Sequence, residues 1–244
     1  MAPPTGSDGV RVTIFASSTP WTAAAHSTAS KEFGRLLAEA GCVAVFGGGN
    51  AGCMGAFYEG VRAAGGRVHG ITHRMFVEPG GSGSSLTKED AGELESLEIV
   101  EGKDLTMRKR RLLDAGDCLV ALPGGVGTLD ELFMAVTENG VAMFSKQPLL
   151  PILLLNVDGY YDGVIEQMRR AKADGMLRHE VPFYFHVVST PAEAVAWCCK
   201  QPCRGVVPPA PPPERAAYRA GIVHGAVAGA MAAAVAAAVA MRWR

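Results

Sequence analysis

The sequence predicts an α/β fold: a Rossmann-like, doubly wound parallel sheet that forms a single domain and carries a C-terminal appendage. Short apolar runs alternate with segments of helical periodicity, which is the pattern of a parallel sheet wrapped by helices. Glycine-rich turns follow two of these runs, at residues 47–52 and 123–128. The 244 residues suit one such domain with an appendage. Because open α/β sheets bind ligands beyond the carboxyl ends of their strands, we expect the functional site at that edge.

The individual elements follow from the alternation of apolar runs and helical patterns. Strands are predicted at residues 10–15, 42–46, 67–71, 97–100, 117–122 and 149–156. Helices are predicted at residues 24–40, 54–64, 104–115, from about 129 onward, 160–173 and 191–200. Gly41 ends the first helix as a C-terminal cap. The strand at 149–156 is the most apolar, so we expect it at the centre of the sheet, whereas residues 78–85 have the composition of a flexible loop.

The composition restricts the class of protein. Lys and Arg number 23 against 24 Asp and Glu, and this net charge of -1 gives no footprint for nucleic acid, so we expect no nucleic-acid partner. Hydrophobic residues make up 48% of the chain, which excludes global disorder. The six cysteines lack the paired spacing of a zinc site, and the N-terminus has no apolar signal core. These features predict a cytoplasmic protein with free thiols.

The chain divides into four segments by composition. They are a flexible N-terminus at 1–9, the Rossmann-like domain at 10–203, a Pro-rich linker at 204–219 and an Ala-rich hydrophobic tail at 220–244. The linker favours a stiff, extended polyproline II conformation. The tail reaches the length of about 20 residues that spans a bilayer. Its Ala and Gly content and its His224 weaken that interpretation, so two remain open: weak membrane association, and a helical or disordered appendage.

The motif at residues 123–131 carries the strongest chemical signal. It lies between a predicted strand and a predicted helix, where backbone N–H groups of Gly124, Gly125 and Gly127 can surround a phosphate. The hydroxyl of Thr128 can add a further hydrogen bond. In the alternative interpretation the turn is merely structural, with Thr128 capping the helix and Glu131 completing a capping box. Because that alternative leaves three glycines unexplained, phosphate binding is favoured.

A second glycine-rich turn and the end of the first strand are further candidates. The turn at 47–55 contains a Gly-x-Gly-x-x-Gly match, which alone indicates dinucleotide binding only weakly. Its candidate contacts are Gly48, Gly49 and Asn50. No acidic residue for a ribose follows the next predicted strand, which disfavours NAD. Ser18 either touches the ligand or caps the following helix.

A basic run at residues 103–111 contains one cation that differs from the others. Most of the run has the character of a solvated helix face, but Arg108 shares an apolar stripe with Leu105 and Leu112. A guanidinium directed inward requires an anionic or hydrogen-bonding partner. We therefore take Arg108 as a functional residue and its neighbour Lys109 as a second candidate cation.

Together these motifs resemble the Lonely Guy family of cytokinin-activating phosphoribohydrolases, over about residues 10–180. That family carries Pro-Gly-Gly-x-Gly-Thr-x-x-Glu, which is intact here at 123–131. It also carries Met-x-x-Arg-Lys, which here ends in Arg108 and Lys109 and has Leu105 in place of the methionine. Both signatures at this separation make the resemblance specific.

The resemblance implies a Rossmann-like fold and hydrolysis of the N-glycosidic bond of a nucleoside 5′-monophosphate. The substrate would be a cytokinin nucleotide or AMP, and the products a free base and ribose 5-phosphate. It further implies a homodimer or larger homo-oligomer that needs no cofactor. Members are often labelled lysine decarboxylases, a reaction that requires a pyridoxal Schiff-base lysine, and Lys109 is the only lysine at a motif position. We also expect no metal, because the acidic residues lack the spacing of a metal site. Residues 138–140 depart from the family pattern, so the identity of the preferred nucleobase stays open.

The proposed catalytic residues are Arg108 and Glu131. Cleavage of a ribosyl bond builds oxocarbenium character that a carboxylate stabilises. Glu131, expected in the first turn of its helix, would also orient or deprotonate the attacking water. Arg108 would contact the substrate and keep Glu131 ionised. The alternatives are a nucleotide or cofactor carrier on the same fold without hydrolysis and, less favoured, an NAD(P)-dependent oxidoreductase.

Overall fold

The computed structural model describes residues 9–77 and 96–203. The predicted loop at 78–85, the Pro-rich linker and the Ala-rich tail lie outside these ranges, as do the first eight residues. Within the described ranges, strands and helices alternate along the chain as the sequence predicts.

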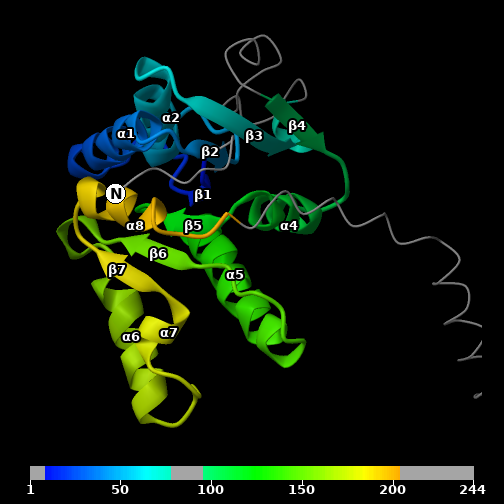
Figure 1. Ribbon diagram of the computed structural model, residues 1–244, viewed down its shortest axis with the longest axis vertical. Helices are drawn as coiled ribbons and strands as arrows, with labels where there is room; N and C mark the ends of the chain where they lie inside the picture. Colours follow the sequence, from blue (N-terminus) through cyan, green and yellow to red (C-terminus); the bar gives the residue numbers. More distant parts are fainter. Residues whose placement is uncertain (1–8, 78–95, 204–244) are drawn as a thin grey trace, which may run out of the picture. The chain divides into compact units, whose positions relative to one another are not determined.

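A single parallel sheet organises the described residues (Figure 1). Its strands are β1 (Arg11–Phe15), β2 (Val43–Phe46), β3 (Arg67–His73), β4 (Ser96–Val100), β5 (Cys118–Ala121), β6 (Ile152–Leu155) and β7 (His186–Val188). They lie in the order β4-β3-β2-β1-β5-β6-β7, and each neighbouring pair is parallel. The chain thus runs outward from β1 to one edge and then returns to build the other half, which is the doubly wound arrangement. This confirms the predicted fold class.

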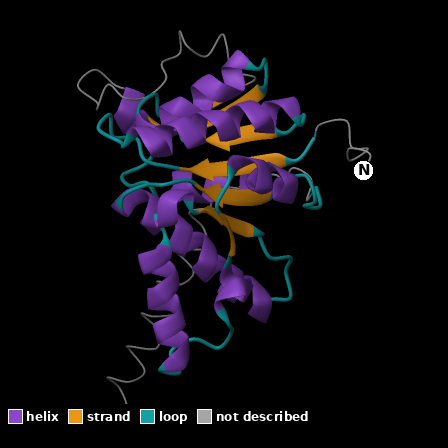
Figure 2. Ribbon diagram, turned by 90° about the vertical axis from the view of Figure 1, so that its left-hand side faces the viewer, coloured by secondary structure: helices purple, strands orange, loops and turns teal. Residues whose placement is uncertain are grey.

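Helices cover both faces of the sheet (Figure 2). They are α1 (Ala24–Glu39), α2 (Gly52–Ala63), α3 (Arg74–Val77), α4 (Thr106–Ala115), α5 (Val126–Phe144), the 3-10 helix η2 (Val157–Gly159), α6 (Asp162–Ala173), α7 (Val181–Tyr184) and α8 (Pro191–Cys198). One core packs α1, α2 and α8 against the sheet, and the other packs α4, α5 and α6 against the opposite face. The strands are therefore buried on two sides, which explains why they appear as continuous apolar runs.

Three expectations about the elements need correction. The strand β6 is not central, because β7 pairs with it on the outer side and β1 lies in the middle of the sheet. The strand β7 is absent from the predicted strands, because its three residues are too few to show a repeat and none of them is fully buried. The helix α5 begins at Val126, three residues before the predicted start, and so includes Gly127 of the turn, while Gly125 is its extended N-cap.

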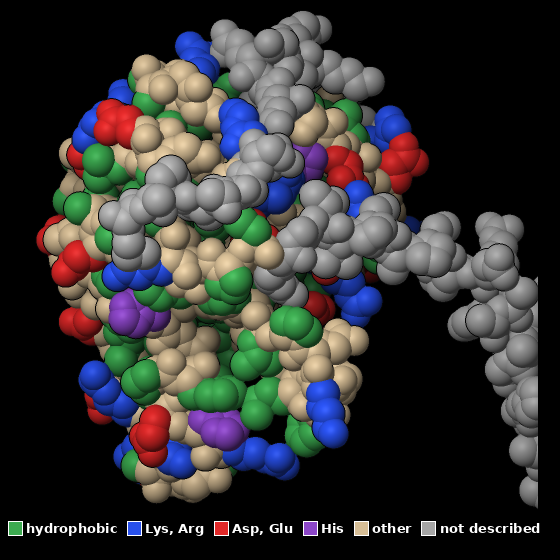
Figure 3. All heavy atoms as spheres, in the orientation of Figure 1, with side chains coloured by type: hydrophobic (Ala, Val, Ile, Leu, Met, Phe, Trp, Pro, Cys, Tyr) green, Lys and Arg blue, Asp and Glu red, His purple; other side chains and the backbone are tan. Residues whose placement is uncertain are grey.

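The surface and the cysteines bear on where the protein works. On the face shown in Figure 3, basic and acidic side chains are interspersed rather than gathered by sign. All six cysteines are free thiols, and four of them, Cys42, Cys53, Cys118 and Cys198, are buried. Within residues 9–77 and 96–203, no helix has the length and apolar character needed to cross a membrane.

Candidate active site

Three turns meet at the carboxyl edge of the sheet because their strands β2, β1 and β5 are neighbours. The N–H of Ser17 donates to the carbonyl oxygen of Pro123 at 3.1 Å, and the N–H of Met54 donates to the carbonyl oxygen of Ser17 at 2.9 Å. The turn after β2 can approach so closely because Gly52 has a φ of +61° and no side chain. A Cβ on Gly52 would lie 2.6 Å from the carbonyl oxygen of Thr19.

Arg108 lies at the centre of this edge and is only 7% exposed. From helix α4, its Nε donates to the carbonyl oxygen of Ile71 at 3.2 Å and its Nη2 to that of Gly47 at 3.2 Å. Its Nη1 donates to Oε1 of Glu131 at 3.1 Å. The guanidinium also lies over the ring of Phe76, 5.8 Å from its centroid. The predicted inward cation is therefore held by strands β2 and β3 and paired with the predicted carboxylate.

Gly47 makes room for this guanidinium. A Cβ on Gly47 would lie 2.0 Å from Nη2 of Arg108, well inside contact distance. The sequence pattern includes Gly47 in the Gly-x-Gly-x-x-Gly match but gives no reason to single it out, since the requirement comes from a side chain 61 residues away.

Glu131 is 9% exposed and lies in the second turn of α5, not in the first as expected. Burial raises the pKa of Glu131 above its ordinary value, and the charge and hydrogen bond of Arg108 lower the pKa by less. Arg108 therefore opposes the effect of burial on this carboxyl, although desolvation is the larger of the two. A raised pKa makes the carboxylate of Glu131 a stronger proton acceptor than an exposed glutamate.

The start of α5 excludes the capping-box interpretation of the motif. The N-cap residue is Gly125, no side chain caps the helix, and Thr128 is buried inside the first turn. The N–H of Leu129 is the first to donate within the helix, to the carbonyl oxygen of Gly125. The N–H groups of residues 126–128 thus lie outside the helical ladder, at the positive end of the helix dipole.

The glycines of this turn differ in what they require. A Cβ on Gly124 would lie 2.1 Å from Oγ1 of Thr128, so the fold itself demands a glycine there. A Cβ on Gly125 or Gly127 would meet no atom within 4 Å. Packing therefore does not explain these two glycines, whereas a ligand seated on the exposed turn would.

Two tyrosine hydroxyls donate hydrogen bonds to the backbone of this turn. Sequence patterns alone assigned these tyrosines no role in the site. Tyr160 donates from its hydroxyl to the carbonyl oxygen of Gly124 at 2.7 Å, and Tyr161 to that of Leu122 at 2.6 Å. Both follow β6, so their contact with the end of β5 depends on the neighbourhood of these strands. The hydrogen bonds fix the backbone of the turn before any ligand binds.

The remaining predicted residues lie around this centre. Gly48 has a φ of +78° and Gly49 donates from its N–H to Sδ of Met54 at 3.2 Å, so both are buried parts of the turn after β2. Ser18 is exposed and does not cap α1, whose N-cap is Ala23. Lys109 forms an ion pair with Asp130 at 2.8 Å.

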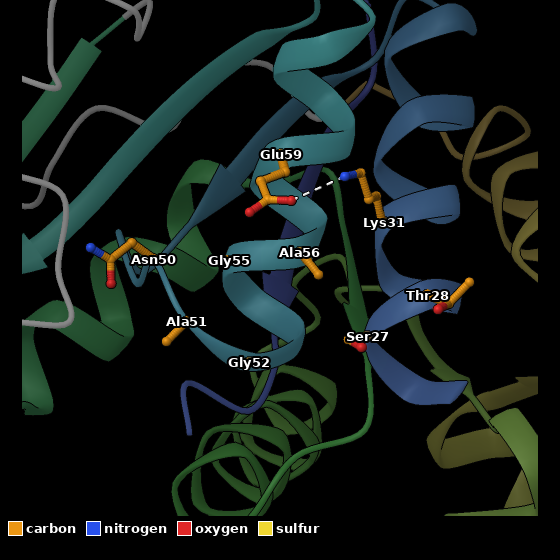
Figure 4. Close-up of a pocket in the computed structure, with 9 residues that line it drawn as sticks. All are labelled: Ser27, Thr28, Lys31, Asn50, Ala51, Gly52, Gly55, Ala56 and Glu59. Carbon is orange, nitrogen blue, oxygen red and sulfur yellow. Dashed lines mark hydrogen bonds and ion pairs between the residues drawn. The ribbon is translucent and has the colours of Figure 1, made fainter. Parts of the chain in front are cut away.

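Asn50 lines a hollow of about 290 Å³ between α1 and α2, away from the Arg108–Glu131 pair. Figure 4 shows this hollow, across which Lys31 and Glu59 pair at 3.1 Å. Among the described residues that line this hollow, the ion pair Lys31–Glu59 is exposed on both sides, whereas the Arg108–Glu131 pair is buried. Among the described residues, no cluster of three or more His, Cys, Asp or Glu side chains has metal-binding geometry.

The sequence of this chain is similar to those of known proteins. A family model described as "Possible lysine decarboxylase" matches residues 54–198. The "Probable cytokinin riboside 5′-monophosphate phosphoribohydrolase LOGL5" of Oryza sativa subsp. japonica is 34% identical, and the match covers 68% of this chain but only 62% of the relative. The "Cytokinin riboside 5′-monophosphate phosphoribohydrolase LOG5" of Arabidopsis thaliana is 33% identical, with 69% and 68% covered.

A solved structure has a similar fold. The X-ray structure of TM1055 has a TM-score of 0.55 and 26% sequence identity, and the match covers 77% of this chain and 97% of that chain. The extent of the family match and the identity to the curated relatives show that the chain belongs to the Lonely Guy family.

Proposed function

We propose that this chain hydrolyses the N-glycosidic bond of a nucleoside 5′-monophosphate, which yields a free base and ribose 5-phosphate. The observation that carries the proposal is the buried Arg108–Glu131 pair beside the open N–H groups of the turn at 125–128. Relatives named cytokinin riboside 5′-monophosphate phosphoribohydrolases support a cytokinin nucleotide as substrate. AMP is the second substrate that we propose.

The phosphate is bound by the first turn of α5. The N–H groups of residues 126–128 and the helix dipole favour a dianion there, and the space above Gly125 and Gly127 admits its oxygens. Lys109 adds positive charge close to Glu131, because it pairs with Asp130, the preceding residue of α5. Ser18, which is exposed after β1, is a further proposed substrate contact from the neighbouring strand.

The reaction follows from the position of Glu131. As the bond between C1′ and the base nitrogen lengthens, positive charge grows on the sugar, and the carboxylate of Glu131 stabilises it. A water attacks C1′ and transfers a proton to Glu131, while the departing base takes the bonding electron pair. The proton on Glu131 then passes to the base, which restores the carboxylate. Arg108 fixes the carboxylate through Nη1, and its own backbone bonds to Ile71 and Gly47 keep it in place.

The test is release of the base from AMP and from a cytokinin riboside 5′-monophosphate by the purified chain. Glu131→Gln should lower the rate at least about 100-fold and still bind AMP, because the negative charge and the proton acceptor are lost while the size of the side chain is kept. The matched control is Glu138→Gln on the same helix, whose carboxylate pairs with Arg110 at 3.7 Å. Equal rates for the two variants would refute the proposed role of Glu131.

The same assay separates the enzyme from a carrier. A nucleotide or cofactor carrier has no use for a buried carboxylate beside a guanidinium, and this pair therefore supports hydrolysis. If the unmutated chain binds AMP but releases no base, the carrier is the better description.

We further infer a cytosolic homo-oligomer. On α5, Phe133, Val141 and Phe144 are exposed at spacings that place them on one side of the helix, which supports an interface with a second copy. The free thiols support a reducing compartment. Light scattering measures the assembly directly, and a monomer would contradict it.

A further inference from the structure

Two consecutive polar side chains at the end of β3 are buried, and each has one polar atom without a hydrogen-bond partner. Within the described part of the chain, Oγ1 of Thr72 and Nε2 of His73 make no hydrogen bond. Thr72 is fully buried and His73 is 2% exposed. Leaving such atoms unpaired costs free energy, so each requires a reason, and a ligand that pairs with them is one.

A backbone N–H two residues along the chain selects the tautomer of His73. The N–H of Met75 donates to Nδ1 of His73 at 3.2 Å, which makes Nδ1 the acceptor. The proton of the neutral ring then lies on Nε2. His73 thus presents a buried N–H donor that lacks an acceptor among the described residues.

The segment that holds this donor also contacts the proposed catalytic pair. Phe76, three residues on, lies under the guanidinium of Arg108. His73 is two residues after Ile71, whose carbonyl oxygen accepts from Arg108, so both side chains lie on the sheet face that α4 covers. Nε2 of His73 lies beside the turn that precedes α4, 3.8 Å from the position of a Cβ on Gly102.

The order of the strands assigns this position to one end of the substrate. The proposed phosphate site follows β5, and β3 lies three strands away, at about 14 Å for strands about 4.8 Å apart. Arg108 stands between the two, bonded to the carbonyl oxygens of Ile71 within β3 and of Gly47 directly after β2. A nucleotide with its phosphate over β5 and its sugar beside Glu131 therefore extends its base toward β3.

We infer that His73 is a base-binding residue: its Nε2–H donates to a ring nitrogen or carbonyl oxygen of the nucleobase. This inference rests on the proposed function, because it assumes that the phosphate lies on the first turn of α5. It names a contact that selects among bases by their hydrogen-bond acceptors. Loss of one such bond weakens binding of the nucleotide and leaves binding of its sugar phosphate unchanged.

The experiment measures binding rather than turnover, so that it does not depend on hydrolysis. Isothermal titration with AMP and with ribose 5-phosphate is carried out on full-length chains that carry Glu131→Gln. His73→Phe should weaken AMP about tenfold and leave ribose 5-phosphate unchanged. His73→Gln, whose amide nitrogen supplies a donor at a similar reach, should recover most of the AMP affinity.

The matched control is His69→Phe. His69 lies on the same strand and the same face, but it is bonded to Ser96 near the other end of β3, so neither affinity should change. Unchanged AMP binding in His73→Phe, or an equal loss for both ligands, would overturn the inference, the latter because it indicates a structural role. If the Glu131→Gln parent binds no AMP, both the inference and the proposed function fall. If the unmutated chain binds AMP through His73 but releases no base, only the proposed function falls.

Discussion

A single residue, Arg108, shows how far the sequence can define this site. Its place on an apolar helical stripe predicts a buried cation, and the structure gives that cation three hydrogen bonds. Two of its acceptors are backbone carbonyl oxygens, which leave no mark in the sequence. Phe76 likewise contacts the guanidinium from a helix of four residues that has no periodic pattern to predict it. The sequence could predict the charged residues of the site, but it could not predict the carbonyl oxygens and the aromatic ring that hold Arg108 in place.

The pH dependence of the reaction should report the environment of Glu131. Since the carboxylate is the form that accepts a proton from water, kcat/KM should fall as the pH drops through the pKa of Glu131. Burial raises that pKa above 4.5, so the acid limb should lie at higher pH than for an exposed glutamate. The pH profile of kcat/KM for AMP measures it.

Asp130 provides the matched variant for this prediction. The negative charge of Asp130 contributes to the raised pKa of Glu131, although its own side chain is 57% exposed. Asp130→Asn removes that charge and should move the acid limb to lower pH. A limb that stays in place or moves upward would show that a different group controls the profile.

At the scale of elements, periodicity located the long helices and the buried strands within a few residues. It failed where an element is short or half-exposed, as in β7 and α7, because three or four residues complete no repeat. It also placed the start of α5 too late, since glycine normally argues against a helix and here Gly127 lies in the first turn of one. The error matters, because the earlier start turns Thr128 from a cap into a residue of the first turn.

The two glycines of α5 that meet open space allow a direct test of the phosphate site. Gly127→Ala should weaken binding of ribose 5-phosphate by about tenfold or more, because the methyl group occupies the space above the free N–H groups. Gly140→Ala, in the same helix and equally free of clashes, should leave binding unchanged and raise the free energy of unfolding by about 1 kcal/mol. Titration calorimetry and urea unfolding measure both quantities. Equal affinities for the two variants would place the phosphate elsewhere.

For the whole molecule, the parallel sheet is what brings distant motifs together. Because all strands point the same way, turns that follow β1, β2, β3 and β5 meet at one edge although they span more than 100 residues of sequence. Alternation of elements predicts this edge. The order of strands is not predictable from apolarity, since β6 is as buried as a central strand and yet lies next to the short β7. Strand order in turn decides which end of the site each residue serves.

This arrangement leads to a prediction about the appendage. The residues that we propose for catalysis and binding lie between Ser18 and Glu131, and the tyrosines that support the turn end at Tyr161. A chain that ends at Val207 should therefore keep the kcat/KM of the full-length chain for AMP within about twofold, a change of less than 0.5 kcal/mol. A tenfold loss would mean that residues 208–244 contribute to the site or to an assembly that the site requires.

The same pair of chains decides between the two interpretations of the Ala-rich tail. Cosedimentation with anionic lipid vesicles compares full-length and shortened chains at low and at physiological salt. If residues 220–244 associate with membranes through their apolar surface and flanking arginines, only the full-length chain should sediment with the vesicles, and less of it at the higher salt. If both chains stay in the supernatant, the tail is an appendage without membrane affinity. Because the proposed catalytic residues precede the Pro-rich linker, either outcome should leave the rate of base release unchanged.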